Sequence, residues 1–306
     1  MKYEVFWKNP GYKPSKPLKG ITETDFLIVG GGISGLSLAH FLLAQGVSKK
    51  RIVVVESGVV GLGSTGRSAG ILIPEIETES NVGWDTFLVR YGLTLAKRYR
   101  KAYRGALHAI EKVIEDGEIS CDAKKGDFLI LARDEEARER VESDIRARRL
   151  MGERPQRLRG MSLANEFGSP GFIFAERDVE ALAVNPLALV QGFAEYLRRR
   201  GVAVYEQSPL LSTYGHTARF ENGAVHFKKI IYARGVGEAH RDLHKYVTTI
   251  AVTEPLAKAD LEELKLADLD LFIDEEGTRS FHYGKVTGDG RLLLGYGDVR
   301  VATRIA

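Results

Sequence analysis

The chain has 306 residues, of which 44% are hydrophobic and 28% charged, and its formal net charge is +3. A chain of this size and composition can bury a sizeable core and is expected to form two domains. The small net charge excludes the strongly basic surface typical of proteins that bind nucleic acid or anionic membranes. The single cysteine, Cys121, excludes an internal disulfide framework and favours a cytoplasmic location. Scarce Asn and Gln beside abundant Arg and Glu favour a thermophilic source.

Residues 1–22 hold three prolines among lysines, which predicts an extended lead-in without a core of its own. The apolar stretch at 26–44 is interrupted by glycines, so it predicts neither a signal peptide nor a membrane span. No integral membrane association is therefore expected.

Three glycines follow the short apolar run Phe26–Val29, which predicts a buried parallel strand. Gly30 permits a tight turn, Gly32 lets the backbone approach a pyrophosphate, and Gly35 allows close contact between helix and strand. Residues 34–45 then predict a helix, whose first N–H groups and positive dipole end favour phosphate. These parts predict a dinucleotide-binding strand–loop–helix unit.

A second apolar strand, Ile52–Val55, ends at Glu56. This acid lies about 20 residues beyond the glycines, the distance expected for a carboxylate that binds ribose hydroxyls. A carboxylate at this position disfavours the 2′-phosphate of NADP. The small residues that follow, up to Leu72, predict a second main-chain cradle for a longer cofactor, with hydroxyl donors on Ser64, Thr65 and Ser68.

The segment Gly63-Ser-Thr-Gly-Arg-Ser-Ala-Gly70 resembles the Gly-x-Ser-Gly-Arg-Asn-x-Gly segment of the D-amino-acid-oxidase-like superfamily of FAD-dependent oxidoreductases. This group includes glycine oxidase, sarcosine oxidase and gamma-glutamylputrescine oxidoreductase. The two departures, Thr65 and Ser68, keep a short polar side chain. The resemblance implies that the segment passes along the flavin ring, with Arg67 near its polar edge.

Further matches extend the resemblance over roughly residues 22–298. The passage from Asp178 to Glu206 resembles the family's Asn-Pro, helix and Gly-Val strand, which places the adenine near Ser208–Leu211. Lys228–Gly235 resembles a strand that normally ends Ala-Thr-Gly, and Arg234 in place of Thr is either an added phosphate contact or a difference in detail. Val252–Leu256 resembles a Thr-Glu-Pro-Leu strand of the gamma-glutamylputrescine oxidoreductase branch, and Phe281–Gly297 resembles the hairpin at the substrate face of the flavin.

The residues predicted to hold FAD come from these glycine-rich segments and from the adenine and phosphate passages. They are Gly30, Gly31, Gly32, Ile33, Ser34, Gly35, Glu56, Ser57, Gly63, Ser64, Thr65, Arg67, Ser68, Ala69, Gly70, Ile71, Leu210, Ala233, Arg234 and Gly235.

Two long helices are predicted elsewhere, over 84–117 and 133–150. The tyrosines of the first are interpreted as core or interface packing, and the opposite charges of the second as a solvated face. Short strands are predicted at 128–131, 171–175, 229–232, 250–253 and 291–294.

The predicted fold is α/β: a Rossmann-like FAD-binding domain with a second α+β substrate domain on a mostly antiparallel sheet. The first domain is expected to comprise residues 23–80 and about 186–240. The second is expected to comprise about 81–185 and 241–306.

The chemistry implied by the resemblance is oxidation of a C–H bond next to nitrogen in a small amine or amino acid. The sequence holds no zinc-type spacing and no Ser-His-Asp order that would compete with this interpretation, and no metal is expected. The predicted substrate contacts are Tyr283, His282, Lys285 and Tyr296. Strand alternation puts Tyr283 and Lys285 on one face, so His282 and Tyr283 cannot both face the flavin.

Two departures from the family pattern leave alternatives open. In the sarcosine oxidase branch a Lys that helps oxygen react and a His stand where this chain has Leu293 and Gly297, so oxidase and dehydrogenase activities both remain possible. The family also continues beyond the hairpin with a Gly-rich segment that closes the flavin site. Its absence here supports an alternative, an FAD-binding subunit or fragment that is inactive alone and completed by a partner chain. A third hypothesis is a flavin-binding interaction module without catalysis.

Overall fold

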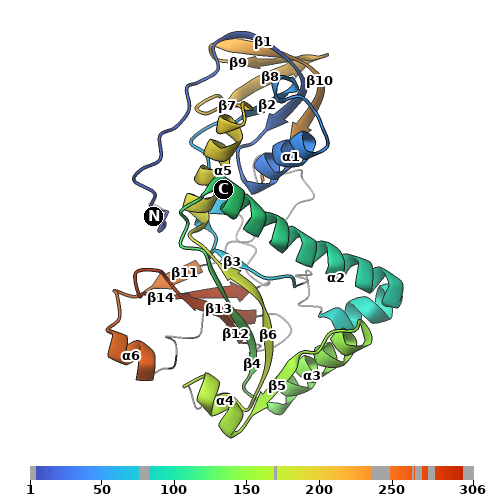
Figure 1. Ribbon diagram of the computed structural model, residues 1–306, viewed down its shortest axis with the longest axis vertical. Helices are drawn as coiled ribbons and strands as arrows, with labels where there is room; N and C mark the ends of the chain where they lie inside the picture. The colour runs from blue at the N-terminus through green and yellow to red at the C-terminus, as the bar shows by residue number, and fades with distance from the viewer. Residues whose placement is uncertain are drawn as a thin grey trace. The chain divides into compact units, whose positions relative to one another are not determined.

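The computed structural model describes residues 5–75, 83–168, 171–235, 249–263, 265, 271–274 and 280–298 (Figure 1). The chain divides into two compact units. Unit 1 comprises Met1–Ser68, Lys112–Cys121 and Asn185–Arg241, and unit 2 comprises Ala69–Glu111, Asp122–Val184 and Asp242–Ala306. Each unit is described separately.

Unit 1 is built on a sheet with the strand order β7-β2-β1-β10-β9-β8. Strands β1 (Gly20–Val29), β2 (Ile52–Val55), β7 (Ala203–Tyr205) and β10 (Gly223–Tyr232) pair in parallel, while β8 (Leu210–Tyr214) and β9 (Thr217–Phe220) add an antiparallel edge. Its helices are α1 (Ile33–Ala44), α5 (Pro186–Arg199), and the short η1 (Lys49–Arg51) and η2 (Thr65–Arg67). The order β1-α1-β2 confirms the strand–loop–helix unit predicted from the glycines.

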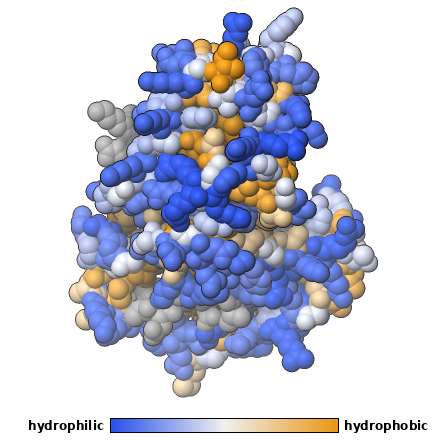
Figure 2. Space-filling model, turned by 45° about the horizontal axis from the view of Figure 1, so that its top comes forward, coloured by the Kyte–Doolittle hydropathy of each residue, from blue (hydrophilic) through white to orange (hydrophobic). Residues whose placement is uncertain are grey.

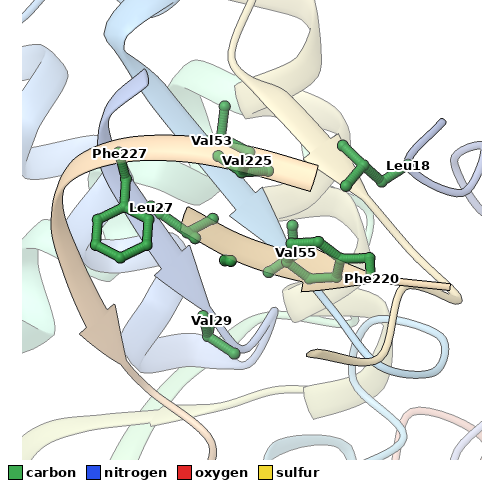
Figure 3. Packing of buried hydrophobic residues seen from close by; sticks show 9 residues of the cluster. Leu18, Leu27, Val29, Val53, Val55, Phe220, Val225 and Phe227 are labelled. Atoms are coloured by element: carbon green, nitrogen blue, oxygen red, sulfur yellow. The ribbon is translucent and has the colours of Figure 1, made fainter. Parts of the chain in front are cut away.

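The core of unit 1 is apolar on both faces of β1 and β2, as expected for parallel strands. Figure 3 shows one face, where alternate residues of neighbouring strands meet. These residues are Leu27 and Val29 of β1, Val53 and Val55 of β2, Val225 and Phe227 of β10, Phe220 of β9, and Leu18 from the lead-in. Ile28, Ile52 and Val54 are fully buried on the other face. Continuous burial explains why these strands are short runs of aliphatic residues.

Unit 2 is built on a second sheet with the order β11-β14-β13-β12-β4-β6-β3, and β5 also pairs with β6. Its pairs are antiparallel except for β4 with β12, so the sheet is mostly antiparallel as predicted. The strands are β3 (Ile71–Leu72), β4 (Lys124–Ala132), β5 (Gln156–Arg159), β6 (Phe174–Ala183), β11 (Thr249–Val252), β12 (Leu271–Asp274), β13 (Ser280–Val286) and β14 (Leu292–Asp298). The helices are α2 (Trp84–Gly117), whose last residues belong to unit 1, α3 (Glu135–Leu150), α4 (Met161–Glu166) and α6 (Lys258–Glu263).

Helix α2 is interrupted at Gly92, whose φ of 79° and ψ of 163° are not helical. The side chains before and after this kink form an aromatic cluster, in which the ring of Phe87 lies 4.7 Å from Tyr91 and 5.2 Å from Tyr99. Tyr91 and Tyr99 are 49% and 46% exposed, so of the two alternatives predicted for these tyrosines, core packing is wrong and interface packing stays a prediction. Phe87 alone of these three side chains is buried.

Helix α3 also departs from its prediction. Its first half carries surface ion pairs, such as Glu136 with Arg140 at 3.0 Å, as a solvated face requires. In its second half Asp144 and Arg148 are buried, and Arg148 is only 1% exposed. The solvated-face interpretation therefore holds for the first half and is wrong for the second, because tertiary packing supplies partners that the charge pattern cannot reveal.

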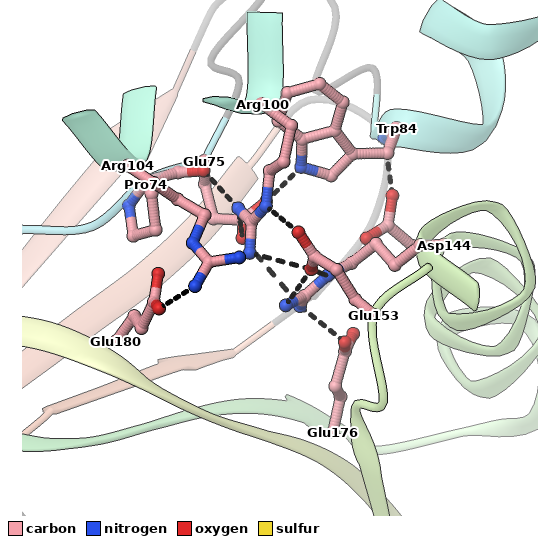
Figure 4. A network of polar contacts seen from close by, with 10 residues as sticks. Pro74, Glu75, Trp84, Arg100, Arg104, Asp144, Glu153, Glu176 and Glu180 are labelled. Atoms are coloured by element: carbon pink, nitrogen blue, oxygen red, sulfur yellow. Dashed lines mark hydrogen bonds and ion pairs between the residues drawn. The ribbon is translucent and has the colours of Figure 1, made fainter. Parts of the chain in front are cut away.

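Those partners form a buried network of arginines and carboxylates in unit 2 (Figure 4). Arg148 pairs with Glu176 at 2.5 Å and with Glu153 at 2.9 Å. Arg100 pairs with Glu153 at 2.6 Å and with Glu75 at 2.7 Å. Two cations and three carboxylates thus compensate one another away from solvent, which is the condition under which buried charges are tolerated.

Trp84 connects this network to Asp144. Its indole Nε1 donates to Glu75 at 2.7 Å, and its main-chain N–H donates to Asp144 Oδ1 at 2.5 Å. Burial, reinforced by the charge of Glu75, raises the pKa of Asp144 to about 7. Burial also acts upward on Glu153, but the hydrogen bond and charge of Arg100 hold the pKa of Glu153 below its usual value. The pKa values of these two carboxyl groups are therefore shifted in opposite directions, that of Asp144 upward and that of Glu153 downward.

Most of the surface drawn in Figure 2 is hydrophilic, with apolar side chains in patches between the polar ones. Among the described residues, no helix is both long and apolar enough to cross a bilayer. The same part of the chain holds no group of three or more His, Cys, Asp or Glu side chains arranged to bind a metal ion.

Candidate cofactor site

The glycine loop between β1 and α1 is shaped by two close approaches. Gly30 has a φ of +122°, and a Cβ there would lie 2.2 Å from the carbonyl oxygen of Ala233. A Cβ on Gly35 would lie 2.0 Å from the carbonyl oxygen of Gly30. Both contacts are with backbone, so a side chain could enter only if β1, α1 or the strand end at Ala233 moved. The turn and the close helix–strand contact predicted for these glycines are therefore present.

The N-terminus of α1 opens beside this loop. Gly32 is the N-cap and supplies no side-chain cap, and no acidic residue stands in the first turn. Gly32, Ile33 and Ser34 are accessible, whereas Gly31 and Gly35 are buried. A Cβ on Gly32 would contact only Thr65 Oγ1, at 3.2 Å. An accessible helix N-terminus without an acid suits an anion such as pyrophosphate.

Glu56 stands at the end of β2, next to the loop. Its Oε2 accepts from the Gly31 N–H at 2.8 Å, and its Oε1 accepts from the Ser57 hydroxyl and the Gly58 N–H, both at 3.0 Å. A carboxylate has about four acceptor positions, so these three donors leave capacity for a ribose hydroxyl. Glu56 is half-buried and joins the glycine loop to the turn that follows β2. The ribose contact itself stays a prediction.

The second glycine-rich segment begins in unit 1 with η2. Gly63, Ser64, Arg67 and Ser68 are exposed, and a Cβ on Gly63 would meet nothing within 4 Å. Thr65 Oγ1 accepts from the Ile33 N–H at 3.2 Å, which ties η2 to the start of α1. The structure therefore brings the two glycine-rich segments of unit 1 together, and their accessible backbone fits an extended anionic cofactor.

The remaining predicted residues of this segment, Ala69, Gly70 and Ile71, belong to unit 2. Ala69 and Gly70 are buried there, and Ile71 opens β3. The carbonyl of Gly70 accepts from the Val184 N–H at 2.9 Å and from Lys285 Nζ at 3.1 Å. Their predicted contact with the flavin stays a prediction.

The passage after β10 lies against the glycine loop. The Ala233 N–H donates to the Val29 carbonyl at 2.7 Å, and a Cβ on Gly235 would lie 4.0 Å from Ser64 Oγ. The guanidinium of Arg234 lies 4.9 Å from the ring centroid of Tyr232, on the same strand end. Arg234 is exposed, so the two alternatives for its role, an added phosphate contact or a difference in detail from the family, both remain predictions.

The passage predicted to hold adenine is largely engaged within unit 1. The Ser208 N–H donates to the Glu56 carbonyl at 2.8 Å, which places this segment beside the ribose-binding candidate. The Ser208 hydroxyl donates to the Glu206 carbonyl at 2.8 Å and accepts from the Leu18 N–H at 2.9 Å. Leu210 is half-buried against the apolar core. Because its side chain is apolar, Leu210 is better suited to the wall of an adenine site than Ser208, whose hydroxyl already makes two hydrogen bonds.

The four predicted substrate contacts lie on the hairpin of β13 and β14, on two opposite faces. Tyr283 pairs with Gly295 and its ring covers that glycine, since a Cβ there would lie 2.0 Å from Tyr283 Cζ. His282 pairs with Tyr296, and their ring centroids are 5.2 Å apart. The structure thus separates Tyr283 from His282, as strand alternation predicted.

Lys285 has a contact that its sequence position did not indicate. It is 3% exposed, and its Nζ donates to the carbonyls of Val184 and Gly70 at 2.6 and 3.1 Å. Lys285 therefore fixes main chain at the start of β3 and the end of β6. Across the hairpin it pairs with the fully buried Leu293.

Glu206, Trp7 and Val60 are the residues around the cofactor loops that sequence reasoning missed. Glu206 is fully buried and accepts from the Val60 N–H at 2.7 Å, and Trp7 Nε1 donates to the Ser68 carbonyl at 2.8 Å. A single Glu after a short strand carries no local signal of such a role. The lone tryptophan in a proline-rich lead-in was the only available hint.

Parallel strands, two converging glycine-rich segments, an uncapped helix N-terminus and an acid at the end of β2 define a dinucleotide-binding protein. The family model described as "FAD dependent oxidoreductase" matches residues 25–304, and the chain belongs to this DAO family. Its cofactor is FAD, and the accessible backbone at Gly32, Gly63 and Gly235 fits such a group.

Curated relatives agree with the family. The chain is 25% identical to the probable oxidoreductase OrdL of Haemophilus influenzae, over 91% of this chain and 66% of that protein. It is also 25% identical to the gamma-glutamylputrescine oxidoreductase of Escherichia coli, over 94% of this chain and 68% of that protein. The chain therefore spans about two thirds of the length of these relatives.

A solved structure shows the same fold. The glycine oxidase from Bacillus cereus superposes with a TM-score of 0.66 and 19% sequence identity, over 90% of this chain and 71% of that one. At this identity the likeness concerns the fold alone.

Proposed function

We propose that the chain oxidises a C–N bond of an amine or amino acid by hydride transfer to FAD. The observation that carries the proposal is the family match over residues 25–304, which includes both glycine-rich segments and the hairpin. The relative named as a gamma-glutamylputrescine oxidoreductase acts on an amine, which supports this substrate class.

FAD supplies the two-electron acceptor when bound. The donor carbon loses a hydride, and the nitrogen lone pair forms the C=N bond of an iminium ion, which becomes the imine product when its N–H proton passes to solvent. The chain's own residues have to hold the neutral amine with this carbon against the flavin and exclude water. Gly32, Ile33 and Glu56 are proposed to bind the pyrophosphate and ribose.

Substrate contact is assigned to one face of the β13–β14 hairpin, either that of His282 and Tyr296 or that of Tyr283. Because the two faces are opposite, the variants His282→Ala and Tyr283→Phe separate them. The variant on the substrate face should raise KM or lower kcat at least tenfold, and the other should leave both within about twofold. Equal effects of both variants would contradict this assignment.

We propose that electrons pass to an acceptor other than oxygen. Leu293 stands at the position that a lysine occupies in the sarcosine oxidase branch, and it is fully buried opposite Lys285. No cation therefore comes from position 293 to assist oxygen. Substrate-reduced protein mixed with air should reoxidise slowly while an artificial acceptor reoxidises it quickly. Rapid peroxide formation would contradict the proposal.

The test of the main proposal is the visible spectrum of the purified chain, followed by anaerobic addition of secondary amines and amino acids. A flavin band at about 450 nm that one of these compounds bleaches supports the proposal. A yellow protein that none of them bleaches contradicts catalysis by the chain alone and supports the alternative of a second chain that completes the site. A colourless protein that FAD cannot reconstitute contradicts the proposal altogether.

A further inference from the structure

Residues 5–18 of the lead-in are fixed to unit 1 along their length although they form no helix or strand. Trp7 and Leu18 are 8% and 1% exposed. The Lys8 carbonyl accepts from the Asn185 side-chain amide at 3.1 Å, and the Leu18 N–H donates to the Ser208 hydroxyl at 2.9 Å. A segment without secondary structure needs such side-chain partners for its main chain. We call residues 5–18 the strap.

Glu206 is the central partner of the strap. One of its carboxylate oxygens accepts from the Tyr12 hydroxyl at 2.8 Å and from the Ser15 N–H at 2.5 Å, and the other accepts from the Val60 N–H at 2.7 Å. Burial and the charge of Glu206 raise the pKa of Tyr12, which keeps its hydroxyl protonated as a donor. Glu206 therefore connects the strap to the segment that follows β2.

The strap is connected to the cofactor loop, residues 57–68, at two places, through Glu206 at Val60 and directly at Ser68. Val60 lies against the glycine loop, because a Cβ on Gly31 would be 2.9 Å from Val60 Cγ2. At the other end, Trp7 Nε1 donates to the Ser68 carbonyl at 2.8 Å. Ser68 closes the short helix η2, whose Thr65 accepts from the first N–H of α1.

We propose that the strap positions the cofactor loop for FAD, with Trp7 and Tyr12 as positioning residues. This inference rests on the proposed function in one respect, namely that the ligand bound by the loop is FAD. The loop between these two anchors contains three glycines, and the side chains of Leu62, Ser64 and Arg67 are exposed, so holding it in place beforehand lowers the entropy lost when FAD binds.

The test uses Trp7→Phe, which keeps an aromatic ring and removes the indole N–H. We expect the Kd for FAD, measured by the quenching of flavin fluorescence, to rise about three- to tenfold, the size of one hydrogen bond. The matched control is Trp84→Phe, which removes the indole N–H that donates to Glu75 in unit 2. This control should leave the Kd within about twofold and, because the chain has two tryptophans, makes Trp7 the single fluorescent reporter of the strap.

Tyr12→Phe is an independent variant, with the 90% exposed Tyr214 changed to Phe as its control. Tyr12→Phe should also raise the Kd for FAD, by about two- to fivefold, while Tyr214→Phe should leave it unchanged. The double variant Trp7→Phe with Thr65→Ala distinguishes positioning from a general loss of stability. Because Trp7 acts through η2, the effects of the two changes on the Kd for FAD should be non-additive, which a merely stabilising role would not produce.

The outcomes separate the two proposals. Weaker binding by both strap variants, with controls unchanged and coupling to Thr65, supports the inference. Wild-type affinity in both strap variants overturns it and leaves the proposed function standing. A wild-type chain that binds no FAD overturns the proposed function, and the inference with it.

Discussion

The cores of the two units differ in how they use polar side chains. Around β1 and β2 of unit 1 the core is apolar, and the buried carboxylate of Glu206 accepts from two main-chain N–H groups and a tyrosine and lies 3.5 Å from the partly exposed Arg198. In unit 2, Arg100 and Arg148 lie buried among carboxylates (Figure 4). The polar groups buried in unit 1 thus depend mainly on main-chain hydrogen bonds, whereas those of unit 2 depend on charge balance. Each dependence can be broken separately.

The largest effect is expected from Arg148→Met in unit 2. It leaves the fully buried Glu176 without its cation at 2.5 Å, and removing one partner of a buried pair costs about 3–5 kcal/mol. Urea denaturation measures the loss in free energy of unfolding. The double variant Arg148→Met with Glu176→Leu should recover most of it.

The control for this prediction is Arg138→Met on the solvated half of α3, where the pair with Glu135 is exposed. This change should alter stability by less than about 1 kcal/mol. Equal losses from Arg138→Met and Arg148→Met would contradict the contrast between the two halves of α3.

In unit 1 the corresponding change is Gly35→Ala. Its Cβ would lie 2.0 Å from the Gly30 carbonyl oxygen, so β1 and α1 must separate, at a cost of about 1–3 kcal/mol. FAD stoichiometry, read from the absorbance of purified protein, should fall to near zero. Gly63→Ala is the control, since nothing lies within 4 Å of its Cβ position, and its fold stability should stay within about 0.5 kcal/mol of wild type.

The charge balance of unit 2 also predicts a pH dependence. The pKa of Asp144 is raised from 3.8 to about 7, so its folded form binds the proton more tightly than the unfolded form. Its contribution is fully present below pH 3.8 and is lost as the pH rises through about 7. Asp144→Asn keeps an acceptor for the Trp84 N–H and cannot ionise.

Relative to Asp144→Asn, the wild type should therefore lose stability between about pH 4 and 7, by about 1 kcal/mol per pH unit. Urea denaturation of both proteins across this range measures the difference. A difference that does not change with pH would show that Asp144 titrates normally. Glu153 acts in the opposite sense, because its pKa is lowered, so its contribution is lost as the pH falls below its usual value of 4.5.

The smallest effect is a gain. Gly105 lies exposed inside α2 with nothing within 4 Å of its Cβ position and no positive φ. Gly105→Ala should stabilise unit 2 by about 0.5–1 kcal/mol through helix propensity. Thermal unfolding measures the gain, and Gly92→Ala, at a φ of 79°, should destabilise instead. A gain at both positions would contradict the kink.

The glycine loop was predictable because its constraints are local. The positive φ of Gly30 and the close approach of Gly35 to the Gly30 carbonyl arise within a few residues, and β2 has the predicted bounds of Ile52–Val55. The contact of Gly30 with Ala233, in contrast, comes from the distant end of β10. The placement of His282 and Tyr283 on opposite faces of the hairpin was predictable for the same reason, because successive side chains of a strand alternate between its two faces.

Short-range spacing and backbone geometry in the sequence determined the fold class, and the resemblance of residues 63–70 and later segments determined the family and its cofactor, while the individual FAD contacts stay predictions. Only the tertiary structure decided which charges are buried and what holds the cofactor loop. Asp144 and Arg148 have the same sequence pattern as the exposed charges before them, and Glu206 meets Tyr12 and Val60 from distant parts of the chain. The free energy of a charged side chain depends on the partners that folding brings to it, and spacing along the chain carries no record of those partners.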